Sequence, residues 1–231
     1  ADNINVGIDH NSTIGLIGSN GAGKTNFLNM ITGYTTPDKG EIYFEGQNIT
    51  GKTPRHITRL GIYRSFQIPQ TFDTMTVEQN LTISASIAIN HLANKYDLNS
   101  NRNSLVGIIK NSIDQFQLGE YQKHLAAHLP EGVRKLLDIA MALVMKPKLL
   151  LLDEPTSGVS ADEKFNIMDM VMAVVRSEKI AVLFVEHDME IIKKYTDRTL
   201  AFYNGNILAD GVTDDVLVKD EVRKHVLGNI L

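Results

Sequence analysis

The sequence predicts an α/β fold built on a mainly parallel sheet, with an antiparallel β segment and an inserted helical region. Short apolar runs typical of buried parallel strands lie at 13–17, 149–152 and 180–185, and segments with helical spacing separate them. Over 77–128 the strand patterns disappear and helical spacing takes over. Strands that alternate with helices favour a parallel sheet covered by helices, so the helical stretch is predicted to be an insertion into that core.

The first 67 residues supply strands and short helices of the core. Alternation of Ile4, Val6 and Ile8 with polar neighbours predicts a half-exposed strand. Apolar runs, turn residues and helical spacing then predict a buried strand at 13–17, a helix at 24–31, a strand at 41–44, a short helix at 54–60 and an extended segment at 62–67.

The middle of the chain is predicted to be helical. Helices are expected at 77–95 and 104–117, with a polar loop at 97–103 between them. A third, amphipathic helix is expected at 134–145 and ends before Pro147. We therefore assign 67–147 to a helical subdomain, and 1–66 together with 148–231 to the α/β core.

The last third of the chain returns to alternating strands and helices. Ser160 and Glu163 form a capping-box pattern, which predicts that a helix starts there. The expected elements are strands at 149–152 and 180–185, helices at 160–176 and 189–195, an antiparallel hairpin at 199–209 and a helical tail at 216–227.

Composition excludes several classes of function. The 231 residues suffice for one large α/β domain or for a core with a subdomain. The net charge of −4 predicts no nucleic-acid binding. Absence of cysteine excludes disulfides, thiolate metal sites and cysteine catalysis. No stretch approaches the roughly 20 apolar residues of a membrane span, so we expect contact with a membrane only through a partner.

A phosphate-binding loop is the strongest functional signal. Residues 18–25 read GSNGAGKT, a complete G-x-x-x-x-G-K-[ST] pattern between a predicted strand and a predicted helix. A glycine-rich turn with a surface lysine is the plain structural alternative. In the functional interpretation, backbone N–H groups bind phosphate oxygens, Lys24 reaches the β- and γ-phosphates, and Thr25 ligates Mg²⁺. The predicted nucleotide-binding residues are Gly18, Ser19, Asn20, Gly21, Ala22, Gly23, Lys24, Thr25 and Asn26.

Polar residues follow the ends of three other predicted strands. Asp153 and Glu154 come after four leucines, where a carboxylate can coordinate Mg²⁺ and a second one can accept a proton from water. By itself the pair is equally compatible with a plain strand-to-loop transition. His187 follows the strand at 180–185 and is a candidate contact of the γ-phosphate, although a capping or partly buried histidine is commoner. Gln67 follows the segment at 62–66, and alone it carries no signal.

Together these motifs resemble the nucleotide-binding subunit of an ABC transporter over essentially the whole chain. The ordered set is GSNGAGKT, Gln67, LPEGV at 129–133, LLLLDEP and the triplet EHD at 186–188. The run RLGIYRSFQ at 59–67, the run VEHDM and the C-terminal tail are similar to the branched-chain amino-acid importer ATPases. The resemblance implies a P-loop NTPase core with an inserted helical subdomain of the ABC type.

The resemblance also implies a role for each motif residue. Glu154 corresponds to the catalytic base and His187 to the switch histidine, and Lys24 and Gln67 complete the catalytic set. Thr25, Gln67 and Asp153 are the implied ligands of Mg²⁺. Gly132 of the signature segment is the implied contact to the nucleotide of the opposite subunit.

The activity implied by the resemblance is ATP hydrolysis, with ATP and Mg²⁺ bound between two ATPase subunits, which are either two copies or two different chains. It would drive transport through integral-membrane permease subunits, from a peripheral position on the cytoplasmic face, with branched-chain or related amino acids as imported substrates. A soluble ABC-type switch without a permease is the alternative. A P-loop kinase is disfavoured by Glu154, His187 and the signature-like segment.

Three departures from the family pattern affect these expectations. The signature is LPEGV where LSGGQ is usual, so Pro130 lacks the serine hydroxyl and Glu131 brings a carboxylate to an anion site. The segment 157–160, which follows Asp153 and Glu154, carries Ser160 where aspartate is usual. No aromatic residue precedes Phe27 to stack on adenine, so we expect such a residue before Ala1 or another way of holding the base.

Overall fold

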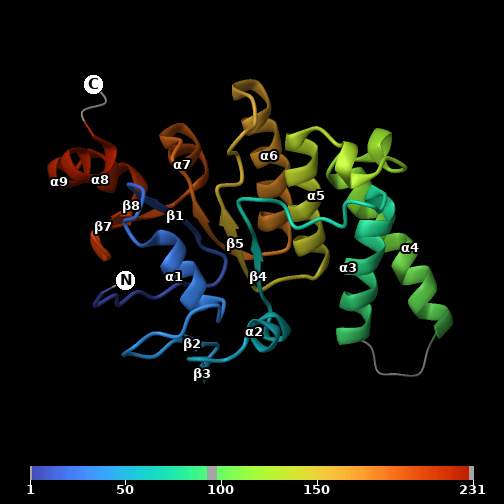
Figure 1. The fold of residues 1–231 in the computed structure, drawn as a ribbon, viewed down its shortest axis with the longest axis horizontal. Coiled ribbons are helices and arrows are strands. Elements are labelled where there is room, and N and C mark those ends of the chain that lie inside the picture. The colour runs from blue at the N-terminus through green and yellow to red at the C-terminus, as the bar shows by residue number, and fades with distance from the viewer. Residues whose placement is uncertain (1, 93–97, 229–231) are drawn as a thin grey trace.

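A computed structural model describes residues 2–92 and 98–228 of the chain. Its centre is a six-stranded sheet in the order β4-β5-β6-β1-β7-β8 (Figure 1). The strands are β1 (Thr13–Gly18), β4 (Ile62–Ser65), β5 (Leu149–Asp153), β6 (Ala181–Val185), β7 (Arg198–Tyr203) and β8 (Asn206–Val212). Strands β4, β5, β6, β1 and β7 pair in parallel, and β8 pairs antiparallel to β7. The predicted sheet type and the antiparallel segment are therefore confirmed.

Helices cover both faces of this sheet, and the side chains of β1, β5 and β6 are therefore buried on both sides. One apolar core lies between the sheet and α1 (Lys24–Ile31), α2 (Pro54–Leu60) and the small hairpin of β2 (Tyr43–Phe44) and β3 (Gln47–Asn48). The second core lies between the opposite face and α5 (Glu131–Val144), α6 (Ala161–Ser177) and α7 (Met189–Tyr195). Within β5, Leu149 and Leu151 face the first core, and Leu150 and Leu152 face the second.

The inserted helices lie beyond the β4 end of the sheet (Figure 1). They are α3 (Val77–Leu92) and α4 (Leu98–Gln115), and α3 packs against both α4 and α5. Two short 3₁₀ turns, Gly119–Tyr121 and Ala126–His128, lead from α4 to α5. The predicted polar loop at 97–103 is wrong for 98–103, which form the first turns of α4; residues 93–97 lie outside the described chain.

The expected strand at the N-terminus is absent from the described chain. Ile4, Val6 and Ile8 lie in an extended segment without strand pairing, and they pack as partly buried side chains on the first core. The alternation of apolar and polar residues therefore arises because one side of the segment contacts the core, and a segment can make this contact without joining the sheet. The helical tail is confirmed as α8 (Thr213–Val218), α9 (Asp220–Val222) and a π-helical turn, Arg223–Leu227.

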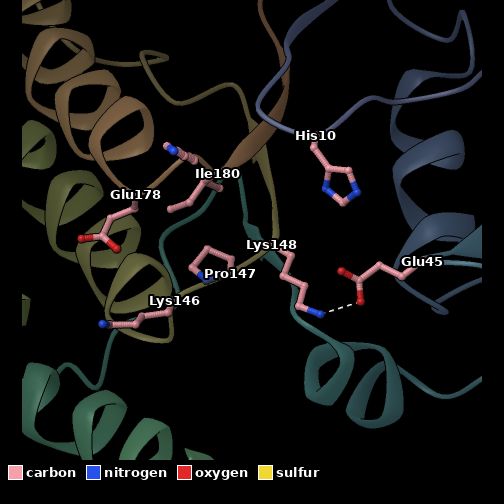
Figure 2. A pocket seen from close by; sticks show the side chains of 8 residues that line it. His10, Glu45, Lys146, Pro147, Lys148, Glu178 and Ile180 are labelled. Atoms are coloured by element: carbon pink, nitrogen blue, oxygen red, sulfur yellow. Dashed lines mark hydrogen bonds and ion pairs between the residues drawn. The ribbon is translucent and has the colours of Figure 1, made fainter.

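Different residues gather at the two ends of the parallel strands. At the edge where β5 and β6 begin, a pocket of about 320 Å³ is lined by charged side chains, including Lys146, Lys148 and Glu178 (Figure 2). Lys148 there donates to Glu45 over 2.5 Å. The motif residues lie at the opposite edge, where β1, β5 and β6 end. No helix within the described parts of the chain is long and apolar enough to cross a membrane.

Candidate functional site

The phosphate loop connects β1 to α1, as the pattern predicts. Gly18 must be glycine, because a Cβ there would lie 2.6 Å from the carbonyl oxygen of Phe202 on β7. Gly23 caps α1 with a φ of 107°, a left-handed conformation that glycine adopts without strain. The first turn of α1 contains no acidic residue, and its N–H groups have no partner within the helix. The loop thus presents N–H donors and a positive helix end to an anion.

Lys24 lies inside this loop. Its ammonium group donates to the carbonyl oxygens of Gly18, at 2.5 Å, and Ser19, at 3.1 Å, and only 6% of the residue is exposed. Burial lowers the pKa of Lys24, while the nearby carboxylates of Glu154 and Asp153 act in the opposite direction. A bound phosphate would give this buried cation a counter-charge.

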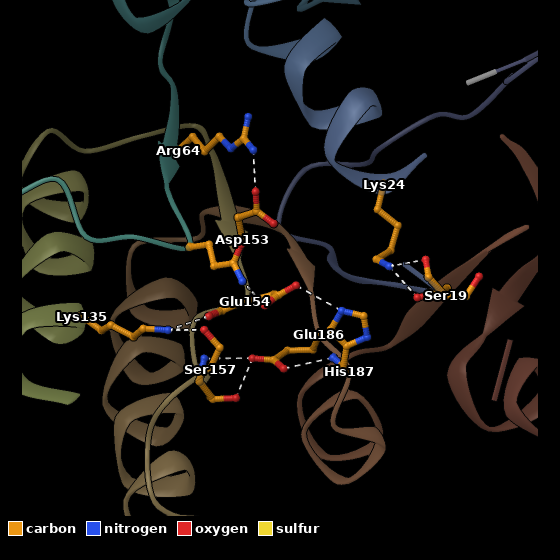
Figure 3. A network of polar contacts seen from close by, with 12 residues as sticks. Ser19, Lys24, Arg64, Lys135, Asp153, Glu154, Ser157, Glu186 and His187 are labelled. Atoms are coloured by element: carbon orange, nitrogen blue, oxygen red, sulfur yellow. Dashed lines mark hydrogen bonds and ion pairs between the residues drawn. The ribbon is translucent and has the colours of Figure 1, made fainter. Parts of the chain in front are cut away.

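Glu154 is held between two of the other predicted site residues (Figure 3). Its Oε2 accepts from Gln67 Nε2 over 2.8 Å, and its Oε1 lies 3.1 Å from His187 Nε2. The backbone of Glu154 has a φ of 51°, which is uncommon for a residue other than glycine. Gln67 and His187, which lie far from Glu154 in the sequence, therefore meet at its carboxylate, next to the phosphate loop.

Asp153 ends β5 and is 7% exposed. Its Oδ2 accepts a hydrogen bond from Arg64 over 2.5 Å, which the sequence analysis did not anticipate. Thr25, Asp153 and Gln67, which the sequence predicts as Mg²⁺ ligands, all carry oxygen donors of the kind that Mg²⁺ prefers. Among the described residues no group of three His, Cys, Asp or Glu side chains could hold a metal.

Four further polar residues support the site, and the sequence motifs assigned a role to none of them: Arg64, Lys135, Asp138 and Glu186. Lys135 on α5 donates to the backbone oxygen of Glu154 over 3.1 Å and to Ser157 Oγ over 2.6 Å. Burial lowers the pKa of Lys135, and Glu131 is first among the carboxylates that oppose this shift. A charged residue at a buried position of an amphipathic helix was the signal available in the sequence.

Two buried acids tie the loops of the site to the core. Glu186, which is 4% exposed, accepts from the backbone N–H of Thr156 at 3.0 Å and from its hydroxyl at 2.6 Å. Asp138 accepts from Ser65 Oγ at 2.5 Å and from the N–H of Gln70 at 2.9 Å. Burial raises the pKa of both carboxyl groups, and these hydrogen bonds partly offset the shift. The first acid holds the loop after Glu154, and the second holds the segment that carries Gln67.

The signature-like segment opens α5. Pro130 is the N-cap residue without a side-chain cap, and Glu131 and Gly132 occupy the first turn. Glu131 lies so close to Gly158 that a Cβ on that glycine would be 2.3 Å from its Oε1. Its carboxylate thus packs on the loop after β5.

Comparison with known proteins identifies the family of this chain. A family model described as "ABC transporter" matches residues 1–157. The probable branched-chain amino acid transport ATP-binding protein LivG of Archaeoglobus fulgidus is 33% identical over 97% of this chain and 88% of its own length. The high-affinity branched-chain amino acid transport ATP-binding protein BraF of Pseudomonas aeruginosa is 29% identical over 97% and 90%.

Solved structures agree with this relationship. A nucleotide-free ATP-binding cassette from an ABC transporter superimposes with a TM-score of 0.79 at 30% identity, covering 94% of this chain and 88% of that one. An ATP-binding cassette in its ADP conformation gives a TM-score of 0.76 at 28% identity with the same coverage. The chain therefore belongs to the ABC transporter family, in which it is an ATP-binding subunit that hydrolyses ATP.

Proposed function

We propose that Glu154 is the base for ATP hydrolysis in this chain and that turnover drives import through a membrane permease. One observation carries the proposal: the Glu154 carboxylate bonds to Gln67 and lies 3.1 Å from His187, beside the loop that holds Lys24. A carboxylate fixed by two polar side chains at the γ-phosphate end of the loop is placed to orient a water and to take its proton.

The proposed reaction uses the site residues as follows. The loop N–H groups, Lys24 and Asn26 bind the phosphates, and Lys24 stabilises the charge that develops on the γ-phosphoryl group. The water oxygen bonds to the γ-phosphorus as the bond to the β–γ bridging oxygen breaks, and Glu154 takes the water proton. His187 orients the water and the γ-phosphate. Mg²⁺, held by Thr25, Asp153 and Gln67, would neutralise charge on the β- and γ-phosphates.

Replacement of Glu154 with glutamine tests this assignment. The amide keeps the size of the side chain and an acceptor for Gln67 but accepts no proton, so hydrolysis should fall at least about 100-fold while ATP affinity stays unchanged. Lys24→Ala is the complementary variant, because it should abolish nucleotide binding itself. Normal hydrolysis by the Glu154→Gln protein, or unaltered ATP affinity of the Lys24→Ala protein, would refute the assigned roles.

We propose that two ATPase subunits, identical or different, enclose the nucleotides, with Gly132 of each facing the ATP of the other. The N–H groups at the start of α5 support this arrangement, whereas Pro130 and Glu131 favour the alternative of a slow ABC-type switch without a permease. The two differ in one measurement. Specific hydrolysis that rises with protein concentration supports a two-subunit site formed by copies of this chain. Activity that is absent or independent of concentration means that the isolated chain does not form that site, which supports either a different partner ATPase or the switch.

We propose that residues 67–147 form a helical subdomain whose apolar surface contacts the permease. Four large apolar side chains are exposed near Gln67 and along α3: Ile68 (74% exposed), Phe72 (46%), Ile87 (44%) and Met75 (36%). Because Ile68 follows Gln67 directly, a permease contact there would lie next to the hydrogen bond between Gln67 and Glu154. Ile68→Glu and Phe72→Glu should abolish co-purification with the permease and leave ATP binding intact, whereas Tyr43→Glu, at an exposed site on β2, should change neither.

We propose branched-chain or related amino acids as the transported substrates, and a peripheral position on the cytoplasmic face, reached through the permease. The support is that the matched relatives LivG and BraF bear the name of branched-chain amino acid transport ATP-binding proteins. Uptake of labelled leucine, isoleucine and valine by cells that express the chain with its permease tests this. Uptake that is equal with wild-type chain and with Glu154→Gln would contradict the proposal.

A further inference from the structure

Arg64 forms a buried bridge between three elements that surround the nucleotide site. It lies on β4, and its Nη2 donates to Asp153 Oδ2 at the end of β5 over 2.5 Å. Its Nη1 donates to Asn29 Oδ1 on α1 over 2.7 Å. The guanidinium carbon lies 4.7 Å from the centre of the Phe66 ring. One planar side chain therefore links the strand that leads to Gln67, the carboxylate of Asp153 and the helix of the phosphate loop.

Both side chains of the bridge are largely buried. The side chains of Arg64 and Asp153 are 5% and 9% exposed, and among the described residues Arg64 Nε is the only buried side-chain nitrogen or oxygen without a hydrogen-bond partner. No hydrogen bond from the described part of the chain reaches Asp153 Oδ1. Arg64 thus occupies one oxygen of the carboxylate and leaves the other for a further ligand.

We propose that Arg64 is a positioning residue, which orients Asp153 so that Oδ1 is available to the metal that accompanies the nucleotide. Figure 3 shows Arg64 reaching Asp153 on the side away from Glu154. The fork of the guanidinium fixes the direction of the carboxylate, because its two arms are anchored on different elements; a lysine ammonium could not reproduce this planar geometry. This inference rests on the proposed role of Asp153 as a metal ligand.

The strength of the effect follows from the behaviour of groups that hydrogen-bond to metal ligands. Loss of such a partner typically weakens metal binding 10- to 100-fold, because the ligand then samples other rotamers. The hydrogen-bond partners of Arg64 are Asn29 and Asp153, which lie outside the phosphate loop at 18–25, so nucleotide affinity in the absence of metal should be unaffected. An arginine that only stabilised the fold would change neither quantity in a folded variant.

Titration with Mn²⁺ in the presence of ADP, followed by electron paramagnetic resonance, tests the proposal without hydrolysis. Arg64→Met should weaken Mn²⁺ binding about tenfold or more. Arg64→Lys and Asn29→Ala should weaken it less, because each keeps a cation near Asp153. Binding of a fluorescent ADP analogue in EDTA should stay within about twofold of wild type in all three.

Asp153→Asn separates this inference from the function it depends on. If that variant binds Mn²⁺ as tightly as wild type, the assignment of Asp153 as a metal ligand is wrong, and the inference falls with it. If Asp153→Asn weakens Mn²⁺ binding but folded Arg64→Met does not, the positioning role alone is overturned. Should Arg64→Met fail to fold, unchanged Mn²⁺ affinity in both Arg64→Lys and Asn29→Ala overturns it equally.

Discussion

Replacing Asp138 with alanine is expected to lower the free energy of unfolding by about 2–4 kcal/mol and to loosen the segment that carries Gln67. Asp138 lies on α5, is 7% exposed, and accepts hydrogen bonds from Ser65 Oγ and from the N–H of Gln70. These two donors flank Gln67 in the sequence. The carboxylate therefore anchors both ends of the short segment between β4 and the loop before α3.

The magnitude follows from the two donors that alanine would leave without an acceptor. A buried donor that loses its partner costs about 1–3 kcal/mol, so two donors together cost about 2–6 kcal/mol. Removing the carboxylate also removes an unfavourable term, because burial raises the pKa of Asp138 and thus disfavours its charged form. The net loss should accordingly fall in the lower half of that range.

Asp138→Asn is the matched control. Its amide oxygen still accepts from Gln70, and its amide nitrogen can donate to the Ser65 hydroxyl, so the loss should stay below about 1 kcal/mol. Urea unfolding followed by circular dichroism gives the free energies, and hydrogen exchange of the Gln70 amide reports the segment. Equal losses for the two variants, or unchanged exchange in the alanine variant, would refute the anchoring role.

Three other variants probe separate parts of the site. Glu186 has a pKa raised above about 4.5 by burial, so the folded state binds more protons and wild-type stability falls as the pH rises above that value. Glu186→Gln has no group that titrates at this position. Urea unfolding between about pH 4 and 7 should therefore show that the free energy of unfolding of the variant rises relative to that of wild type as the pH increases. Gly18→Ala places a Cβ 2.6 Å from Phe202 O and should lower the melting temperature and abolish ATP binding, measured by thermal shift with and without ATP. Lys135→Met removes donors to Glu154 O and Ser157 Oγ, so kcat should fall while the metal-free ATP dissociation constant stays constant.

The local elements were predictable because neighbouring residues encode them. The helix at 24–31 and the short helix at 54–60 coincide with α1 and α2. A glycine turn precedes the first, and Thr53 caps the second, because its hydroxyl oxygen accepts from the N–H of His56. The helix at 189–195 coincides with α7, which Asp188 caps by accepting from Glu190 N. Errors arose where a short pattern had two physical meanings, as with Ile4, Val6 and Ile8.

The motif residues were identifiable from the sequence, because a phosphate loop and polar residues at strand ends follow from local chain order. That these residues lie close together could be inferred as well, because the carboxyl ends of parallel strands lie at the same edge of a sheet. The contacts that orient them were not encoded in any spacing. Arg64 and Asp153 are 89 residues apart, and Ser65 and Asp138 are 73 apart. Such contacts arise only when β4, β5 and α5 pack together. A buried charged group costs free energy unless it is hydrogen-bonded, and the tertiary structure decides which partner lies within hydrogen-bonding distance.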